Sequence, residues 1–515
     1  MRLSRLLAGL AEVPAGDDRV VSGVVADSRR VRPGDLFLAC AGRRRHGAEF
    51  IARAVAAGAA AVVCEVDEGA DGARRLSLRE GVPVIAVSAP PDAGGGIAAE
   101  IAARFHGRPA DALEVVGVTG TNGKSSCCHY LAQCLEASGS ACGLVGTLGH
   151  GRHGALHPAT HTTPDAVTLQ ALLAELRDEG CTHVAMEVSS HALDQGRVTG
   201  VRFAGGLFTN LSRDHLDYHG SMTHYARSKA RLFRSSGLRY AALNADDPAH
   251  RTMLAALPAS TELGTELALY GFGPDLAATV RGRGIGRDAR WLQGHVLAAG
   301  PAGLHLAVAG SWGAGELRSA LLGRFNAGNL LASLAVLLLM GLPLADALAG
   351  LARVRAVPGR MERFGGHGGR PLVIVDYAHT PAALAAVLES LKAFCRGRLW
   401  CVFGCGGGRD RGKRGQMGGI AERLADRVVV TDDNPRDEDP EAIVAEILAG
   451  MRRPAAAEVL HDRAAAIAYA VGQADAQDIV LVAGKGHEDY QLVQGRRLPF
   501  SDRQHVALLV GEAAT

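Results

Sequence analysis

Short apolar runs alternate with helical patterns along almost the whole chain, and most runs end in a polar loop. This alternation predicts α/β units with parallel sheets, in which helices cover both faces and the strands are buried. In the first part of the chain the pattern predicts a helix at 48–57, a second helix that ends at Phe105 after a loop at 89–96, and strands at 20–25, 36–39, 60–64 and 82–87.

The alternation resumes after Gly107-Arg-Pro109, which has the composition of a linker. The segment 265–322 is richer in glycine and in short apolar alternations, which predicts a small β insertion, and 330–351 predicts a pair of helices. Strands are predicted at 115–118, 141–145, 183–188, 205–209 and 240–243.

A second linker, Val357-Pro-Gly359, precedes a third series of strands at 372–375, 399–403, 427–431 and 479–482. Each is followed by a polar loop, as in a Rossmann-like doubly wound sheet, which binds ligands at the carboxyl ends of its strands. With 515 residues, and about 150 residues per domain as a guide, the chain is expected to hold three domains, at 1–110, 111–356 and 357–515.

Composition narrows the class of protein. The net charge of +2 leaves no basic excess for a general nucleic-acid surface. The N-terminus lacks the apolar core of a secretion signal, and the longest apolar stretch, 330–342, is too short to span a bilayer. The ten cysteines include no C-x-x-C and suit reduced thiols. We therefore expect a cytoplasmic protein without nucleic-acid partners or membrane insertion.

The segment Thr119-Gly-Thr-Asn-Gly-Lys-Ser125 lies between an apolar run at 113–118 and a helix predicted at 126–135. A strand–loop–helix of this kind binds nucleotide phosphates through backbone N–H groups, with Lys124 as a mobile cation and Ser125 as a Mg²⁺ ligand. The match to G-x-x-x-x-G-K-[ST] is incomplete, because Val118 holds the first glycine position. The alternative is an ordinary glycine-rich turn before a helix.

Polar clusters follow two further strands of the central segment. Glu187 comes directly after one, and the run from Asn210 to His219 follows the other. Glu187 suits Mg²⁺, and His215 suits a ligand or an orienting group, although helix caps and surface polar residues would give the same pattern. The H-x-x-x-H spacing of His215 and His219 is poor support for zinc, since it lacks the glutamate of H-E-x-x-H and no cysteine is near.

Four polar loops of the last segment combine basic and acidic groups: 376–381, 404–414, 431–436 and 483–488. The second resembles a dinucleotide glycine motif but departs from it at the last position, and it carries Arg409 and three further cations. Beside Glu488, such cations suit a small zwitterion with more than one carboxylate. Solvated loops are the alternative.

Several motifs occur in one order along the chain: 119–125, Glu187, Asp214-His215, Gly323-Arg-Phe-Asn-Ala-Gly-Asn329, Pro358-Gly-Arg-Met-Glu362 and Asp376-Tyr-Ala-His-Thr-Pro381. In this order they resemble the Mur ligases of peptidoglycan synthesis, over essentially the whole chain. The run 25–37 is similar to the opening UDP-binding domain of the family, and Asp433-Asn-Pro-Arg436 with 484–488 narrows the resemblance to its diaminopimelate-adding members.

The resemblance implies an ATP-dependent amide ligase that acts as a monomer with Mg²⁺. ATP would phosphorylate the D-glutamate side chain of UDP-N-acetylmuramoyl-L-alanyl-D-glutamate, and meso-2,6-diaminopimelate would attack the acyl phosphate. Transfer of a phosphoryl group between anions needs charge neutralisation and alignment, which Lys124 and Mg²⁺ can supply.

The resemblance also implies roles for single residues. Lys124, Glu187, His215 and Lys229 would be catalytic, and Mg²⁺ would be held by Ser125, Glu187, His215 and a carbamylated Lys229. ATP would contact Gly120, Thr121, Asn122, Gly123, Lys124, Ser125, Ser126, Asn326, Asn329, Arg360 and Asp376. The UDP-dipeptide would contact Ser28, Thr162, Thr163, Ser189, Gln195 and Arg197, and diaminopimelate would contact Arg409, Asp433, Asn434, Pro435, Arg436, Gly484 and Glu488.

Two departures from the family pattern affect the UDP substrate. His161 stands where asparagine is common, and Arg43-Arg-Arg45 occupies a loop where an Asp-Gly pair is usual. The rival functions are a lysine-adding ligase, which Arg436 disfavours, a folylpolyglutamate synthetase, which lacks a UDP domain, and a non-catalytic nucleotide-binding regulator. The regulator would be expected to lack Lys124, Glu187, His215 or Lys229, and all four are present.

Overall fold

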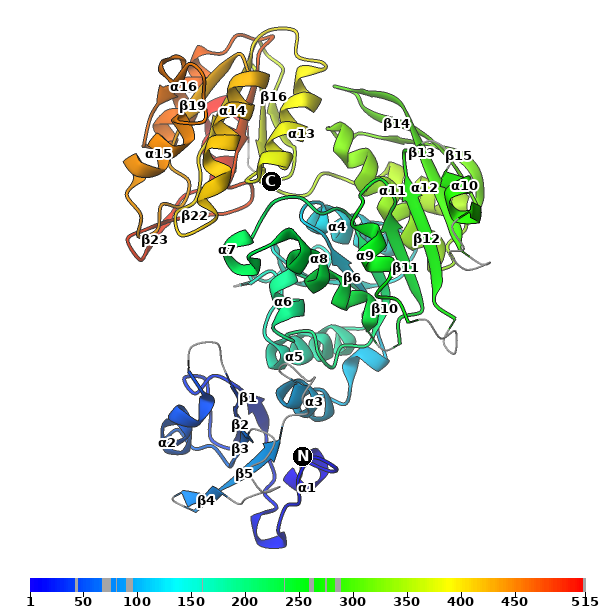
Figure 1. The fold of residues 1–515 in the computed structure, drawn as a ribbon, viewed down its shortest axis with the longest axis vertical. Coiled ribbons are helices and arrows are strands. Elements are labelled where there is room, and N and C mark those ends of the chain that lie inside the picture. Colours follow the sequence, from blue (N-terminus) through cyan, green and yellow to red (C-terminus); the bar gives the residue numbers. More distant parts are fainter. Residues whose placement is uncertain are drawn as a thin grey trace.

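The computed structural model describes residues 1–41, 45–66, 76–79, 81–88, 96–159, 161–235, 237–258, 264–273, 276–282 and 289–512. Three separate sheets, of five, ten and six strands, follow one another along the chain, and a two-stranded hairpin accompanies the third. Figure 1 shows the first sheet at one end of the molecule and the third at the other, with the ten-stranded sheet between them. The predicted α/β class is confirmed, whereas the exact domain boundaries stay a prediction.

The first sheet has the order β1-β2-β3-β5-β4. Strand β4 is antiparallel to β5, and the other pairs are parallel. The strands are β1 (Gly23–Val25), β2 (Asp35–Ala39), β3 (Ala61–Val66), β4 (Leu76–Arg79) and β5 (Val82–Ser88), and the helices are α1 (Leu3–Leu6), α2 (Ile51–Ala56) and α3 (Gly96–Phe105). The strand predicted at 20–25 begins only at Gly23 in the structure, and Val20 is exposed. The predicted loop at 89–96 lies outside the described residues up to 95.

The central sheet carries β6 after the linker, and its parallel core runs β13-β12-β11-β10-β6-β9-β7. Antiparallel strands β14 and β15 extend one edge and β8 the other. These strands are β6 (Glu114–Thr119), β7 (Cys142–Gly146), β8 (Gly149–Arg152), β9 (His183–Glu187), β10 (Phe203–Phe208), β11 (Tyr240–Asn244), β12 (Glu266–Gly271), β13 (Arg290–Gly300), β14 (Gly303–Gly310) and β15 (Gly313–Ser319).

The segment 265–322 corrects one expectation. It is rich in strands, but they continue the central sheet rather than forming a separate insertion, because β12 pairs parallel with β11 and β13 pairs parallel with β12. The buried run from Leu267 to Gly271 fits this position, since strands of a parallel sheet covered on both faces are near-continuous apolar runs.

Helices cover both faces of the central sheet. One core cluster joins α4 (Lys124–Ala137) and α11 (Arg324–Leu339), and the other contains α5 (Ala166–Asp178). Helix α11 is apolar on all sides and almost entirely buried, and α12 (Leu344–Ala352) completes the predicted helix pair. The remaining helices are α6 (Ser190–Asp194), α7 (Leu216–His219), α8 (Met222–Ala230), α9 (His250–Leu254) and α10 (Leu276–Gly282).

The third sheet has the order β16-β17-β21-β18-β19-β20, and only β16 is antiparallel to its neighbour. Its strands are β16 (Glu362–Gly365), β17 (Leu372–Asp376), β18 (Leu399–Phe403), β19 (Arg427–Val430), β20 (Glu458–Val459) and β21 (Ile479–Ala483), with the hairpin β22 (Tyr490–Val493) and β23 (Arg496–Pro499). The helices are α13 (Pro381–Lys392), α14 (Arg414–Leu424), α15 (Pro440–Leu448), α16 (Arg463–Gln473) and α17 (Asp502–Val510).

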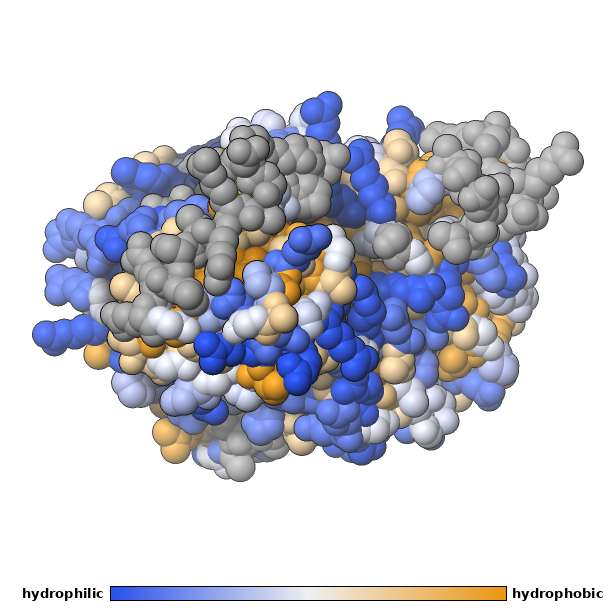
Figure 2. All heavy atoms as spheres, turned by 90° about the horizontal axis from the view of Figure 1, so that it is seen from below, coloured by the Kyte–Doolittle hydropathy of each residue, from blue (hydrophilic) through white to orange (hydrophobic). Residues whose placement is uncertain are grey.

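Hydrophilic and hydrophobic residues are mixed on the face of the molecule seen in Figure 2. In the face drawn in Figure 2, hydrophilic residues predominate and hydrophobic ones lie between them in separate patches. Among the described residues, no helix is both long enough and apolar enough to cross a bilayer.

A buried ion pair fixes two helices of the third sheet. The Arg463 guanidinium donates two hydrogen bonds of 2.7 Å to the Asp502 carboxylate, and both side chains are fully buried. Arg463 also donates to the carbonyl oxygens of Ala483 at 2.9 Å and Asp432 at 3.4 Å. The pair thus ties α16 and α17 to two of the polar loops at the carboxyl edge of the sheet.

We expect Asp502→Ala to lower the free energy of unfolding of this part of the chain by about 3–5 kcal/mol, because it leaves the buried Arg463 charge without its partner. Urea unfolding followed by Trp400 fluorescence, in a background with Trp291 and Trp312 changed to phenylalanine, measures it. Asp489→Ala is the control, since it breaks an exposed ion pair with Arg497 and is expected to have no measurable effect. Equal stability of the two variants would contradict the assignment.

Candidate active site

The loop between β6 and α4 has the backbone of a phosphate loop. Gly120 and Gly123 have φ angles of +150° and +86°, and a side chain at Gly120 would collide with Thr209 on the neighbouring strand end. The Lys124 ammonium folds back and donates to the carbonyl oxygens of Gly120 and Thr121, at 2.9 Å each. Burial lowers the pKa of Lys124, and the carboxylates of Glu187 and Asp214 oppose that shift.

A buried carboxylate lies beside the start of α4. The Ser125 hydroxyl donates to Glu187 Oε1 at 2.8 Å, and Glu187 is only 2% exposed. The backbone N–H of Thr147 donates to the same oxygen at 2.8 Å, while the Thr147 hydroxyl donates to Oε2 at 3.1 Å. Arg360, from the segment leading into the third sheet, reaches Ser125 Oγ at 3.4 Å. Hydroxyl and carboxylate oxygens in this arrangement fit the hard ligands that Mg²⁺ prefers.

Lys229 is buried on the other side of the same loop. It is 1% exposed, and its ammonium donates to Gly120 O at 2.8 Å and lies 4.5 Å from the centre of the Tyr225 ring. Burial, together with the nearby charge of Lys124, lowers the pKa of Lys229 well below its ordinary value. In the described part of the chain, no salt bridge compensates this amine.

His215 pairs with its neighbour Asp214. Its ring Nε2 lies 3.3 Å from Asp214 Oδ2, and its backbone, in the left-handed region at φ +53°, donates to Asp214 Oδ1 at 2.9 Å. Burial lowers the pKa of His215 to about 3, even though Asp214 favours the charged form. His215 is therefore neutral near pH 7, so it is available as a ligand or hydrogen-bonding group rather than as a cation.

Five residues expected to contact the UDP-dipeptide form one hydrogen-bonded string next to Glu187. The Thr163 hydroxyl donates to Glu187 O at 2.8 Å and accepts from Ser189 N–H at 3.1 Å. Arg197 donates to Thr163 O at 3.2 Å and to Gln195 Oε1 at 2.9 Å. Thr162 joins the string because its hydroxyl lies 3.1 Å from that of Thr147.

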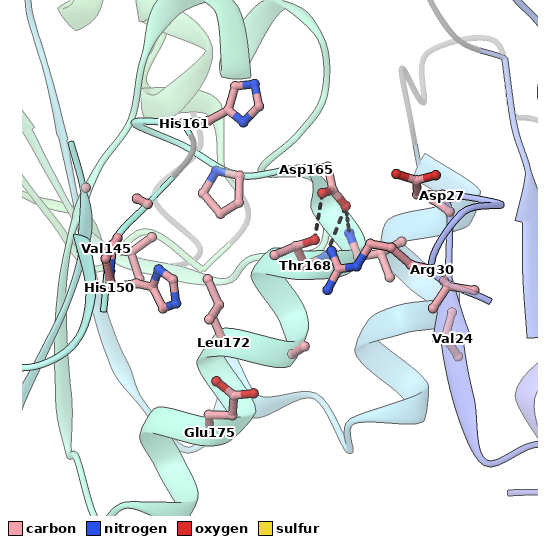
Figure 3. A pocket seen from close by; sticks show the side chains of 18 residues that line it. Val24, Asp27, Arg30, Val145, His150, His161, Asp165, Thr168, Leu172 and Glu175 are labelled. Atoms are coloured by element: carbon pink, nitrogen blue, oxygen red, sulfur yellow. Dashed lines mark hydrogen bonds between the residues drawn. The ribbon is translucent and has the colours of Figure 1, made fainter. Parts of the chain in front are cut away.

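A cleft of about 610 Å³ separates this region from the first sheet. Figure 3 shows Asp27 and Arg30 on one wall and Asp165, Thr168 and His161 across from them. Ser28 directly follows Asp27, which lines the cleft, and Ser28 itself is buried. Its contact with the UDP substrate stays a prediction. Arg43 and Arg44 lie outside the described residues, and Arg45 is exposed.

The two asparagines expected on the adenine side are internal. Asn326 donates to Leu322 O at 2.7 Å and accepts from the Tyr130 hydroxyl at 3.2 Å, and Asn329 donates to Asn326 Oδ1 at 2.8 Å. They are 3% and 8% exposed and join α11 to α4. Their adenine role stays a prediction, and a second pocket of about 490 Å³ lies beside the same end of α11.

Arg360 and Asp376 lie where the segment after α12 meets the third sheet. The Arg360 guanidinium stacks 4.2 Å from the centre of the Tyr377 ring. Asp376 is buried and accepts from Met361 N–H at 2.8 Å, and burial raises its pKa. Both residues thus stand at the carboxyl end of β17, on the side that faces the phosphate loop.

The loops predicted to bind an amino acid bring positive and negative groups together. Lys485, fully buried, donates to Glu488 Oε2 at 2.9 Å and to Asn434 Oδ1 at 3.2 Å, and Asn434 donates to Glu488 Oε2 at 2.9 Å. Arg436 donates to Gly407 O at 2.8 Å. Burial and the nearby charge of Arg409 lower the pKa of Arg436.

Neither guanidinium of this loop cluster has an acidic partner within the described residues. Two guanidinium groups without a salt bridge suit a ligand that carries carboxylates, while Asp433 and Glu488, which lie 3.8 Å and 2.9 Å from Lys485, are the acidic groups that could face its ammonium. Gly484, at φ +117°, lies against Asp433, since a Cβ there would stand 2.7 Å from Asp433 Oδ2.

Sequence reasoning missed three residues that the structure adds to the site. Thr147 holds Glu187, Tyr225 covers Lys229, and Arg463 supports the loop that carries Asp433. Thr147 had no motif to mark it, because its partner Glu187 is distant in sequence, whereas Tyr225 lies one helical turn before Lys229. Arg463 follows an Asp in a helix cap, which gives only a local signal.

A phosphate loop with a buried carboxylate beside it, facing a second sheet with charged loops, defines an α/β nucleotide-binding protein of the phosphate-loop class. Three family models match in order. They describe a Mur ligase family catalytic domain at residues 20–102, a Mur ligase middle domain at 118–337, and a Mur ligase glutamate ligase domain at 359–486.

Curated relatives cover nearly the whole chain. One from Alkalilimnicola ehrlichii, named UDP-N-acetylmuramoyl-L-alanyl-D-glutamate–2,6-diaminopimelate ligase, is 49% identical over 99% of both chains. One of the same name from Pseudomonas aeruginosa is 49% identical over 94% of both. A solved structure with that name is 32% identical over 99% of both chains, with a TM-score of 0.65. The chain therefore belongs to the Mur ligase family.

We expect Thr147→Val to raise the Mg²⁺ concentration needed for half-maximal activity about tenfold or more, because groups that hold a metal ligand in place affect metal affinity by about 10–100-fold. Thr147→Ser, which keeps the hydroxyl, is the matched control and is expected to behave like the wild type. Titration of activity with Mg²⁺ at fixed substrate concentrations measures this. Identical Mg²⁺ curves for the valine and serine variants would refute a role of Thr147 in holding Glu187.

Proposed function

We propose that the protein is an ATP-dependent ligase that joins meso-2,6-diaminopimelate to the D-glutamate of UDP-N-acetylmuramoyl-L-alanyl-D-glutamate. Full-length relatives with that printed name support the proposal. The observation that carries it is the Arg436 guanidinium, which lies near a second guanidinium, Arg409, and near the carboxylates of Asp433 and Glu488. Diaminopimelate presents carboxylates and ammonium groups together, as this distribution of charge requires.

The phosphate loop would hold the ATP phosphates on its backbone N–H groups and on Lys124. The γ-phosphoryl group passes to an oxygen of the D-glutamate side-chain carboxylate, and ADP leaves. Both reactants are anions, so Lys124 and Arg360 lower the barrier by neutralising charge on the transferring group. Ser125 and Glu187 would hold Mg²⁺, which would supply Lewis-acid neutralisation of charge on the phosphates.

The amine of diaminopimelate then attacks the acyl carbonyl as the free base. A tetrahedral intermediate forms and collapses, phosphate leaves, and the attacking nitrogen loses its proton as the amide bond is completed. The Thr163–Arg197 string would hold the UDP-dipeptide beside Glu187, while the loops at 404–414, 431–436 and 483–488 would orient the amine. Both substrates would thus meet at the edge of the central sheet that carries the phosphate loop.

Lys229 fits a carbamate for a physical reason. Carbamylation needs a neutral amine and CO₂, and burial lowers the pKa of Lys229 well below its usual range. The product carries a negative charge, which would compensate Lys124 and supply an oxygen ligand for Mg²⁺. We propose that Lys229 is carbamylated in the active enzyme.

We expect Lys229→Ala to lose nearly all activity and to regain part of it with acetate or formate, because a small carboxylate can occupy the space and charge of the carbamate. Ligase activity with and without the added acids measures this. Lys392→Ala, on an exposed helix surface, is the control and should be unaffected by the acids. An alanine variant with full activity, or one that no acid rescues while the fold is intact, would contradict the carbamate.

The substrate is tested through Arg436. A charge-assisted pair with the distal carboxylate is worth about 1.5–3 kcal/mol, so the wild type is expected to prefer diaminopimelate over lysine by about ten- to a hundredfold in kcat/KM. Arg436→Lys keeps the charge but loses the two-point fork, and it should retain only part of the preference; Arg436→Ala should lose most of it.

Steady-state kinetics with UDP-dipeptide, ATP and either amino acid provide the measurement. ADP formation that requires the UDP-dipeptide separates the ligase from a non-catalytic regulator, and the amino-acid preference separates it from a lysine-adding ligase. Equal kcat/KM for lysine and diaminopimelate in the wild type would overturn the proposed substrate.

A further inference from the structure

The loop that follows β10 is bound to the phosphate loop. The backbone N–H groups of Thr121 and Asn122 donate to O and Oδ1 of Asn210, at 2.8 Å and 3.0 Å. Ser212 N–H donates to the Thr121 hydroxyl at 3.0 Å. The position of the loop at residues 210–215 is therefore coupled to the position of the phosphate loop.

The next residue of that loop, Arg213, reaches across to the third sheet. Its Nε and Nη2 donate to the two carboxylate oxygens of Asp410, at 3.1 Å and 3.3 Å. The Asp410 side chain is 9% exposed and that of Arg213 is 42% exposed. The contact has the two-point geometry of a guanidinium–carboxylate fork, which fixes orientation as well as distance.

The surroundings of Asp410 favour this contact. Asp410 also accepts from Gly412 N–H at 2.9 Å, so its carboxylate is held in place by its own loop. A Cβ at Gly412 would stand 2.5 Å from Arg213 Nη2, and the absence of a side chain there admits the guanidinium. Asp410 directly follows Arg409, one of the two guanidinium groups of the proposed amino-acid site.

A second contact joins the same two loops. His379 Nε2, at the carboxyl end of β17, lies 3.8 Å from Asp214 Oδ2, next to Arg213. Lys413 donates to His379 O at 2.8 Å, which ties the loop of Asp410 to His379. Two successive residues of the central loop thus contact two connected segments of the third sheet.

We propose that Arg213 and Asp410 form a latch, a positioning pair that sets the amino-acid-binding loop against the phosphate loop. This inference rests on the proposed function, since it assigns to the pair the alignment of the incoming amine with the acyl phosphate. Arg213 touches the central domain's nucleotide machinery only through the backbone, and Asp410 acts through the loop of Arg409. The latch therefore governs the second step, amide formation, more than the first.

A double-mutant cycle tests the latch: Arg213→Ala, Asp410→Asn and both together. Asparagine keeps an acceptor for Gly412 N–H and removes the charge, so the loop stays capped. Two readouts are compared, kcat/KM for diaminopimelate and the single-turnover rate of ADP formation with ATP and UDP-dipeptide alone. Lys392→Ala is the control, because it breaks an ion pair with Asp426 within the third sheet.

Each single variant is expected to lower kcat/KM for diaminopimelate about tenfold, the size of coupling found for close charged pairs. The double variant should have about the same kcat/KM as the less active single variant, since the second change removes no further contact. ADP formation should change less than about twofold, and the melting temperature should stay at the wild-type value. The control should leave both readouts unchanged.

Effects that multiply in the double variant would overturn the latch, and so would single variants with wild-type kinetics or an equal loss of ADP formation and amide formation. If the wild type uses a different amino acid, the proposed substrate fails but the same cycle, measured with that amino acid, still decides the latch.

Discussion

Two lysine ammonium groups share one carbonyl oxygen at the centre of the site. Lys124 and Lys229 both donate to Gly120 O, at 2.9 Å and 2.8 Å. Burial lowers the pKa of both amines, and the nearby charge of Lys124 lowers that of Lys229 further. The arrangement becomes favourable when anions enter, which is what a triphosphate and a carbamate would provide.

The fold places further charged groups around these two amines. The parallel strands β6, β9 and β10 are neighbours and end at the same edge of the central sheet. The phosphate loop, Glu187 and Asn210 lie at the ends of these strands, so they meet at that edge although they are far apart in the sequence. Glu187 and Asp214 are the acidic groups that oppose the lowering of the Lys124 pKa. The third sheet brings Arg360 to Ser125, which makes the site more cationic and so more dependent on bound phosphate.

Much of this was accessible from the sequence because it is local. A strand of buried residues followed by Gly-Lys-Ser defines both the phosphate loop and its helix, and alternation located most strands to within two residues. The segment 265–322 was assigned to a separate insertion because periodicity reports strands but not which sheet they join. Thr147, and the contact of Arg213 with Asp410, depend on tertiary neighbours, and no spacing in the chain encodes them. The motif also did not reveal that Asn326 and Asn329 are hydrogen-bonded to each other and to helix α4, because a motif gives residue types but not their contacts.

The specificity site shows how backbone geometry can place a charge. Arg436 has a φ of +56°, a conformation that costs a non-glycine residue about 1–3 kcal/mol and that persists only when its surroundings enforce it. Here the hairpin enforces it, because Arg436 N–H donates to Leu492 O at 2.8 Å and Gln494 N–H donates to Arg436 O at 2.7 Å. From this anchored backbone the guanidinium reaches the Gly407 carbonyl oxygen at 2.8 Å, in the loop of Arg409. The hairpin β22–β23 follows the last strand of the third sheet and adds nothing to that sheet's core. Its backbone contacts hold Arg436 in place, so if Arg436 binds a substrate carboxylate as proposed, substrate choice would depend on a residue in a strained conformation.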